Sequence, residues 1–349
     1  MANAISHDVI QHTADQVYRY MVMDHTGNWG MDIQHWDWVP GVGVIAILSY
    51  FENTHHKDVL DDLTKWAHTN IPTKEQASVI NAMAPFAIFP ALYEYTHDNL
   101  FLEESLRVGQ WMLTEAPRTR EGAFEHTVTE NVSFPEQVWA DTIFMAVLFL
   151  ARLARVTGDR SYAIEAVKQL EIHLKLLEDP DTGVMFHGWN CIAQDHMSAA
   201  RWTRANAWIA VGTPMIMQEL EGITTLSEEA IARYRNMMQG LINFQQNDGL
   251  WSTVLDRPDF YSETSGSAGI ACGILKAIRL GILDISYQDS AQRALKAIVH
   301  KVLPNGEVSG VSGGTPVMPS IEAYNEIPCH PTLYGQGLVL MLLSEKLGE

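Results

Sequence analysis

The sequence predicts an all-α fold, because two kinds of helical pattern alternate along its 349 residues and strand signals are weak. Segments of the first kind are apolar on every face and open with small, Gly, Pro or polar residues. They begin near Trp38, Asn81, Val138, Arg204, Ser265 and Tyr334. Segments of the second kind are apolar on one face only. They lie near residues 5–23, 56–69, 98–114, 161–178, 227–245 and 287–303.

The two patterns indicate different surroundings for their helices. In the one-faced segment 161–178, apolar side chains recur at helical spacing at Ala163, Val167, Leu170, Leu174 and Leu177. A helix of this kind lies between core and water, whereas a helix that is apolar all round belongs in the interior. Six of each kind in alternation therefore predict an inner and an outer ring of helices.

Two concentric rings of six helices form an (α/α)6 barrel, and this barrel needs the whole chain, residues 1–349, as a single domain. A solenoid of stacked helical pairs is the alternative, although solenoids usually keep a tighter repeat than these segments do. In the barrel, the N-termini of the inner helices and the loops before them would form the mouth of a cavity. Ligands normally bind in such concave places.

Composition restricts the partners and the compartment. The chain has 42 Asp and Glu against 23 Lys and Arg, a formal net charge of -19, which argues against nucleic acid or an anionic membrane as a partner. Its longest apolar run is shorter than the ~20 residues that cross a bilayer, and its N-terminus does not resemble a signal peptide. Three scattered cysteines suit a reducing compartment. We therefore expect a cytoplasmic protein.

Asp141 is the first candidate for chemistry, because it is the only ionisable side chain between Val138 and Ala151. An unpaired carboxylate is expensive in an apolar interior, and burial raises its pKa toward neutrality. A carboxylic acid that keeps its proton near pH 7 is suited to general acid catalysis. The structural alternative is a buried Asp that backbone amides or an Arg satisfy.

Further candidates come from the segments that lead into the inner helices. Arg204 follows Trp202 and precedes Trp208 by four residues, and an Arg among Trp residues suits a sugar acid, with a guanidinium for its carboxylate and an aromatic face for its ring. The same residues would equally suit an Arg paired with a Glu beside two core Trp side chains. His187 and His126 lie on loops, where a lone His is more often only solvated.

Two aromatic residues and one long loop are less specific signals. Trp36 and Trp38 precede the first inner helix and would form either a stacking surface or part of the core. The segment 304–330 would either cover the cavity mouth or remain a plain surface loop. No zinc-binding motif and no Gly-rich phosphate loop occurs, so we expect no metal site.

Taken in order, these pieces resemble glycoside hydrolase family 105, the unsaturated rhamnogalacturonyl hydrolases, with the unsaturated glucuronyl hydrolases of family 88 as near relatives. The resemblance runs across most of the chain. Its most specific elements are Gln137-x-Trp139-x-Asp141-Thr, Phe186-His187-Gly188-Trp189 and Trp202-x-Arg204-x-Asn206-x-Trp208.

The resemblance implies an (α/α)6 barrel with Asp141 as the catalytic acid. It also implies a substrate, a lyase-generated oligosaccharide with a 4,5-unsaturated uronic acid at its non-reducing end, and no metal or organic cofactor. His187, Arg204 and Trp208 would line the pocket, with Arg204 and His187 holding the uronate carboxylate. The residues expected to complete the binding site are Trp36, Trp38, Asn81, His126, Gln137 and Trp202.

At one position the chain departs from the pattern. Many relatives have a second Asp at the opening of the second inner helix, where this chain has Asn81. An amide can hydrogen-bond a sugar hydroxyl but cannot act as a base, so a mechanism with two carboxylates is in doubt.

Two other function classes remain open at this stage. Sugar epimerases of the N-acylglucosamine type share the barrel, but they use paired His on inner helices, which here carry almost none. A non-catalytic carbohydrate-binding protein would bind saccharides without turnover.

Overall fold

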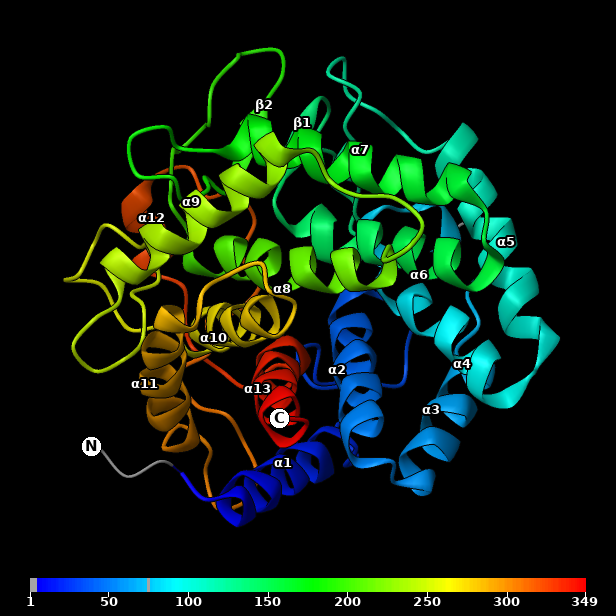
Figure 1. Ribbon diagram of the computed structural model, residues 1–349, viewed down its shortest axis with the longest axis horizontal. Helices are drawn as coiled ribbons and strands as arrows, with labels where there is room; N and C mark the ends of the chain where they lie inside the picture. The colour runs from blue at the N-terminus through cyan, green and yellow to red at the C-terminus, as the bar shows by residue number, and fades with distance from the viewer. Residues whose placement is uncertain (1–4, 74–75) are drawn as a thin grey trace.

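The computed structural model describes residues 5–73 and 76–349, and in these ranges the main helices form two concentric rings (Figure 1). The inner ring contains α2 (Trp38–Thr54), η2 (Asn81–Ile88) continued by α4 (Phe89–Thr96), η3 (Ile143–Val147) continued by α6 (Leu148–Thr157), α8 (Thr203–Glu219), α10 (Thr264–Arg279) and α13 (Leu333–Leu347). The outer ring contains α1 (His7–Met21), α3 (Lys57–Thr69), α5 (Asn99–Thr114), α7 (Arg160–Leu177), α9 (Glu228–Phe244) and α11 (Gln288–Val299). The predicted (α/α)6 barrel is confirmed.

The inner ring is closed by the two ends of the chain. Successive inner helices pack against one another, and α13 packs against α2 to complete the circle. Each later outer helix packs on the inner helix that precedes it, while α1 packs on α13. Figure 1 shows this last pair side by side, α1 in blue and α13 in red. One hydrophobic core runs through both rings, because each inner helix is buried on both sides.

Two inner helices depart from a regular α-helix. The second starts as the 3₁₀ segment η2 and becomes α-helical only at α4, and its residues Pro85 and Pro90 lack the amide hydrogens that a continuous helix needs. The apolar run around Asp141 was predicted to be helical from Val138, and this is wrong. Gln137–Trp139 form strand β1, and the helix begins at Asp141 and continues into the π-helical turn η3.

Strand β1 pairs antiparallel with β2 (Gly188–Asn190) in a two-stranded ribbon. The ribbon joins the loop that carries His187 to the residues just before Asp141, and the backbone amide of Ala140 donates to the carbonyl of His187 at 3.1 Å. Asp141 thus lies at the point where strand β1 ends and the helix begins. The π-helical turn follows directly, and such turns are frequent at functional sites.

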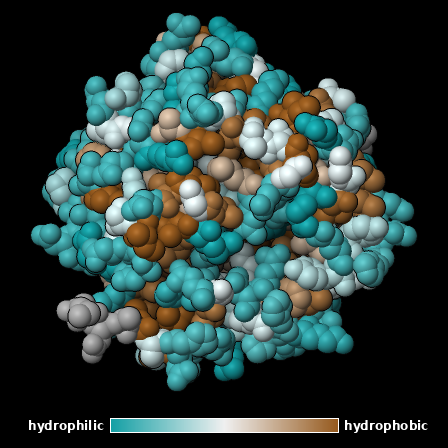
Figure 2. All heavy atoms as spheres, in the orientation of Figure 1, coloured by the Kyte–Doolittle hydropathy of each residue, from teal (hydrophilic) through white to brown (hydrophobic). Residues whose placement is uncertain are grey.

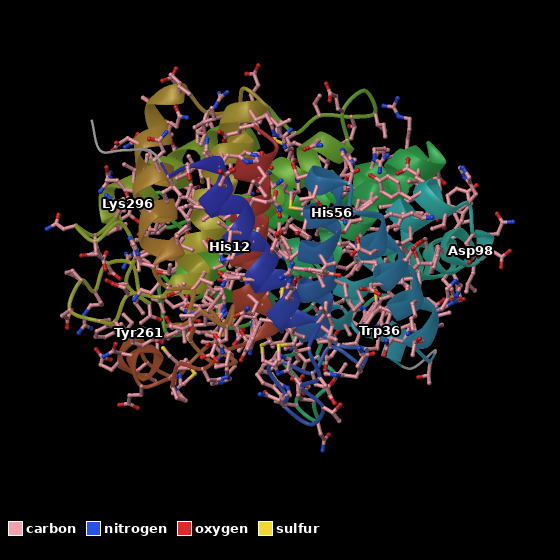
Figure 3. All side chains as sticks on the ribbon, turned by 90° about the horizontal axis from the view of Figure 1, so that it is seen from below. His12, Trp36, His56, Asp98, Tyr261 and Lys296 are labelled. Carbon is pink, nitrogen blue, oxygen red and sulfur yellow. The ribbon has the colours of Figure 1, made fainter. Side chains whose placement is uncertain are left out.

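The loops that lead into the inner helices gather at one end of the barrel. Figure 3 shows this end at the bottom, with Trp36 before α2 and Tyr261 before α10 both toward it. The segment between α11 and α13 lies there too and contains the short helix α12 (Ile321–Asn325). The Tyr261 hydroxyl donates a hydrogen bond to the Tyr324 carbonyl of this helix at 3.3 Å. The remaining short elements are η1 (Gln76–Ser78) and η4 (Ile285–Tyr287).

The opposite end holds a network of ion pairs. Lys276 lies 2.6 Å from Glu345, and Arg152 lies 3.2 Å from Glu219, which also pairs with Arg155. Cations are favourable where helices end, because the free carbonyls there carry partial negative charge. Hydrophilic residues also surround the periphery of the face drawn in Figure 2. Within the described ranges, every helix is too short or too polar to cross a bilayer.

The close approach of α8 and α10 gives a test of the ring packing. A Cβ added at Gly273 would collide with the backbone of Ala210, whereas one at Gly43 on α2 would meet Leu333 at an ordinary 3.4 Å. We expect Gly273→Ala to lower the free energy of unfolding by about 1–3 kcal/mol through overpacking. Gly43→Ala should raise it by about 0.5–1 kcal/mol. Urea unfolding of both variants measures this, and equal effects would contradict the packing described.

Candidate active site

A cavity of about 600 Å³ opens at the end of the barrel where the inner helices begin. Its wall combines aromatic rings with few charges. The lining residues are Trp29, Trp38, Asn81, His126, Val128, Glu130, Val132, Phe134, Trp139, Asp141, Trp202, Arg204 and Gly314–Val317. Its carboxylates among the described residues are Asp141 inside and Glu130 at the exposed rim.

Asp141 reaches the cavity from the start of its helix. Its side chain is 13% exposed, and its Oδ2 lies 3.4 Å from Nε2 of His187, which is 1% exposed. Thus β1 and β2 hold the acid and the imidazole against each other from two loops. This pair places a titratable carboxylate in the cavity wall with a proton-carrying ring directly against it.

The charge state of Asp141 differs from the sequence prediction. Burial raises the pKa of its carboxyl, as predicted, but contact with His187 and the charges of His187, His126 and Arg204 lower it further than burial raises it. The net shift is downward, so the expectation of a carboxyl that keeps its proton in the free protein is wrong. The positive and hydrogen-bonding groups of the cavity, which the apolar run does not reveal, are the reason.

His187 is held on both sides of its ring. Its Nδ1 lies 2.7 Å from the Tyr324 hydroxyl, and its ring packs on Trp202 with centroids 4.3 Å apart. Burial lowers the pKa of His187, and Asp141 opposes that shift without cancelling it. The neutral imidazole is therefore favoured beside an ionised carboxylate.

His126 lines the same wall. Its ring stacks on Trp139 with centroids 4.0 Å apart and planes 12° apart, and its backbone amide donates to the Gln137 carbonyl at 3.0 Å. Complete burial lowers the pKa of His126 to about 4. The imidazole is thus a neutral hydrogen-bonding group near pH 7.

Arg204 lines the cavity, but its guanidinium is committed to the protein. It donates from Nη1 to the Ser312 carbonyl at 3.1 Å and from Nη2 to the Gly313 carbonyl at 2.9 Å, and it lies 3.5 Å from the buried Glu263. It is also flanked by the rings of Trp202 and Tyr334. The alternative of an Arg paired with a Glu beside aromatic rings therefore describes Arg204 better than a free carboxylate clamp does.

Several polar atoms of the cavity have no hydrogen-bond partner within the described residues. They include Oδ1 of Asn81, Nδ1 of His126, Nε1 of Trp202 and Oδ2 of Asp141, and Nε2 of His187, next to this lining, also has none. Buried polar atoms are nearly always paired in folded proteins, so a cluster of exceptions in one cavity points to a polar ligand or to water.

Four of the predicted site residues lie outside the cavity lining, and one of them is His187, which contacts the lining residue Asp141. Trp36 is buried in the core, where its Nε1 donates to the Ala82 carbonyl at 3.0 Å. Trp208 is fully buried and packs on Phe144 with centroids 5.1 Å apart. The side chain of Gln137 accepts a hydrogen bond from Nε1 of Trp139 at 2.9 Å and so supports the wall from behind.

Other residues in the cavity wall or behind it had no signal in the sequence. Trp29 packs edge-on against Trp38 with centroids 6.1 Å apart, and Tyr324 contacts His187 from a segment 137 positions later in the chain. The loop residues Gly314–Val317 form part of the wall, so the segment 304–330 is more than a plain surface loop. Within the described ranges, no group of three or more metal-ligating side chains occurs.

Comparisons with known proteins agree with this architecture. The model of glycosyl hydrolase family 88 matches residues 13–348. The chain belongs to glycosyl hydrolase family 88. It is 34% identical over 315 residues, 89% of this chain and 90% of the relative, to the unsaturated rhamnogalacturonyl hydrolase YesR of Bacillus subtilis.

Two solved structures also resemble this family 88 chain. One is described as a possible member of the GH105 family from Salmonella enterica, with a TM-score of 0.91 and 29% identity over 99% of this chain and 96% of that one. The other, described in the same way, is from Klebsiella pneumoniae, with a TM-score of 0.92 and 29% identity over 99% of this chain and 95% of that one.

The depressed pKa of His126 predicts an acid-sensitive fold. Between pH 6.5, where a free imidazole titrates, and about pH 4, the unfolded chain binds a proton that the folded chain excludes, so stability falls as pH falls through this window. His126→Gln should reduce this dependence by about 1.4 kcal/mol per pH unit. Urea unfolding at several pH values measures it, with His12→Gln on the exposed side of α1 as control. An unchanged slope in His126→Gln would contradict the burial of a neutral ring.

Proposed function

We propose that this chain removes a 4,5-unsaturated uronic acid from the non-reducing end of lyase-generated oligosaccharides, with Asp141 as the catalytic acid. The observation that carries the proposal is the contact between Asp141 and His187 at an aromatic cavity in which Asp141 is the one internal carboxylate among the described residues. The similarity to an unsaturated rhamnogalacturonyl hydrolase supports it. The family match also favours a hydrolase over an epimerase or a non-catalytic binding protein.

One internal carboxylate is enough for this substrate. Ordinary glycosidases place two carboxyl groups around an oxocarbenium-like transition state. Here Asn81 lines the cavity at the position where a second acid was expected, and an amide cannot act as acid or base. An unsaturated uronide is a vinyl ether, so its C4=C5 bond can be protonated directly. This protonation needs one acid and no second carboxylate.

The reaction would proceed by hydration. Asp141 donates a proton to C4, and the ring oxygen stabilises the cation that forms at C5. Water then adds to C5 and returns its proton to the Asp141 carboxylate. The resulting hemiketal opens, and the hemiacetal left at C1 expels the neighbouring sugar as an alcohol. Cleavage of the glycosidic bond therefore follows from hydration of the double bond.

The pKa of Asp141 is lowered in the free protein, so its carboxyl is ionised there. It must therefore take up a proton when the substrate binds. A uronate carboxylate entering the cavity adds a negative charge near Asp141, and like charges favour the neutral form of a carboxyl group. A bound substrate would displace water from the cavity, and the lower local dielectric would strengthen this effect. Substrate binding would thus raise the pKa of Asp141 and load it with the proton that C4 receives.

Contacts to the sugar acid would come from groups that lack partners. The Nε1 of Trp202, the side chain of Asn81 and the ring of His126 can each hydrogen-bond an oxygen. Trp38, stacked on Tyr334 with centroids 5.2 Å apart, offers its partly exposed face to a sugar ring. Arg204 would act at longer range, through its charge and through the loop that it holds.

Two proposals on domain organisation and compartment accompany this function. The chain would act as one catalytic domain over its full length, supported by a core that runs through both rings. It would work in the cytoplasm, supported by the free state of Cys191, Cys272 and Cys329.

Replacing Asp141 tests the assignment of the acid. We expect Asp141→Asn to lower kcat by ~10²–10⁴, because the amide cannot donate a proton in the transition state. Loss of the ultraviolet absorbance of the double bond in an unsaturated rhamnogalacturonan disaccharide measures turnover. Asp61→Asn, on the exposed side of α3, is the matched control and should remain fully active. Near-normal turnover by Asp141→Asn would assign the acid elsewhere.

Asn81 should behave as a binding residue. We expect Asn81→Ala to raise KM by about 2–10-fold, the worth of one neutral hydrogen bond, with kcat much less affected. Steady-state kinetics on the same disaccharide separate the two constants. A fall in kcat at constant KM would instead indicate that Asn81 acts in the transition state.

A further inference from the structure

Tyr324 contacts the proton-carrying pair from outside the cavity lining. It lies on α12, in the segment between α11 and α13, and its hydroxyl is 2.7 Å from Nδ1 of His187. The other ring nitrogen of His187 faces Asp141. A phenol, an imidazole and a carboxylate thus form a continuous line that ends at the reacting group.

The contacts of the phenol define the direction of its hydrogen bond. The Tyr324 oxygen accepts a hydrogen bond from the backbone amide of Met318 at 3.2 Å, and its side chain is buried. A hydroxyl has one proton to donate, and leaving it unpaired in the interior is costly. The Ser198 hydroxyl also contacts the phenol: burial raises the pKa of Tyr324, and this hydroxyl, like the Met318 amide, acts as a donor that lowers it. The acceptor at 2.7 Å is Nδ1 of His187, so the phenol donates to that nitrogen.

This direction determines the tautomer of the imidazole. A neutral ring that accepts at Nδ1 carries its proton on Nε2. The Nε2–H then points at the Asp141 carboxylate, 3.4 Å away, whereas the other tautomer would set a nitrogen lone pair against the carboxylate oxygens. The two ends of the line therefore require the same proton position.

We propose that Tyr324 is a positioning residue, which holds His187 as the Nε2–H tautomer with that proton directed at Asp141. It touches neither the cavity nor the substrate and acts only through His187. The proposal rests on the proposed function, because His187 is the group that orients the catalytic acid Asp141.

The segment between α11 and α13 also forms part of the cavity wall, so the position of Tyr324 depends on this loop. Met318, which anchors the phenol, follows directly after the wall residues Gly314–Val317, and Arg204 binds the start of this loop at Ser312 and Gly313. The ionisable groups that face His187 are Asp141, Tyr324 and Arg204, and His126 faces Asp141 from the opposite wall.

Long-range ¹H–¹⁵N spectra of histidine-labelled protein test the tautomer without any substrate. We expect Nδ1 of His187 to be unprotonated and hydrogen-bonded and Nε2 to be protonated near pH 7, with the His187→Gln spectrum assigning the signals. In Tyr324→Phe, the Nδ1 signal should move to the higher frequency of a nitrogen that accepts no hydrogen bond. A protonated Nδ1 in the natural protein, or an Nδ1 signal that Tyr324→Phe leaves in place, would overturn the proposal.

Kinetics give the second readout. Tyr324→Phe should lower kcat by about tenfold at nearly constant KM, since one buried hydrogen bond that orients the ring is lost. Tyr234→Phe is the matched control, because that phenol is also fully buried and donates to the Ala210 carbonyl at 2.8 Å instead of to His187. An unchanged kcat in Tyr324→Phe contradicts the positioning role. If the natural protein turns over no unsaturated oligosaccharide, the proposed function fails while the spectra still decide the tautomer.

Discussion

The contact between Asp141 and His187 is the interaction on which the account depends. In isolation, an acid among apolar residues would keep its proton, and the sequence alone points that way. In the folded chain the neighbouring imidazole and the charges of the cavity favour the ionised form. In the proposed mechanism, Asp141 would gain a proton when the anionic substrate binds, and the free and bound states would differ in the charge of this one group.

The barrel supplies the geometry for this contact. Its inner helices begin at one end, so the loops before them converge there, and the ion pairs that terminate the helices lie at the other. The ribbon of β1 and β2 then joins the two loops that carry the acid and the imidazole. Arg204 fixes a third loop against the wall, and its charge remains close enough to influence Asp141. Structural and electrostatic roles are therefore combined in one side chain.

Much of the architecture was readable from the sequence, because hydrophobic periodicity reports directly on which faces a helix buries. The predicted outer helix over 161–178 and the observed helix over 160–177 nearly coincide. The site was less readable. Trp36 and Trp208 are residues of a type that could form a stacking surface, but they lie in the core. Only the packing around each ring distinguishes a core position from a binding surface. Tyr324 contributes through a contact 137 positions away, which no local pattern encodes.

The most direct test of the central claim is the fate of the double bond when an unsaturated rhamnogalacturonan disaccharide is turned over in deuterium oxide. Nuclear magnetic resonance of the product at early times locates the incorporated deuterium. Protonation by Asp141 predicts a single deuterium on one face of C4, acquired before the glycosidic bond breaks. Release of the neighbouring sugar with the C4=C5 bond still intact would contradict the account.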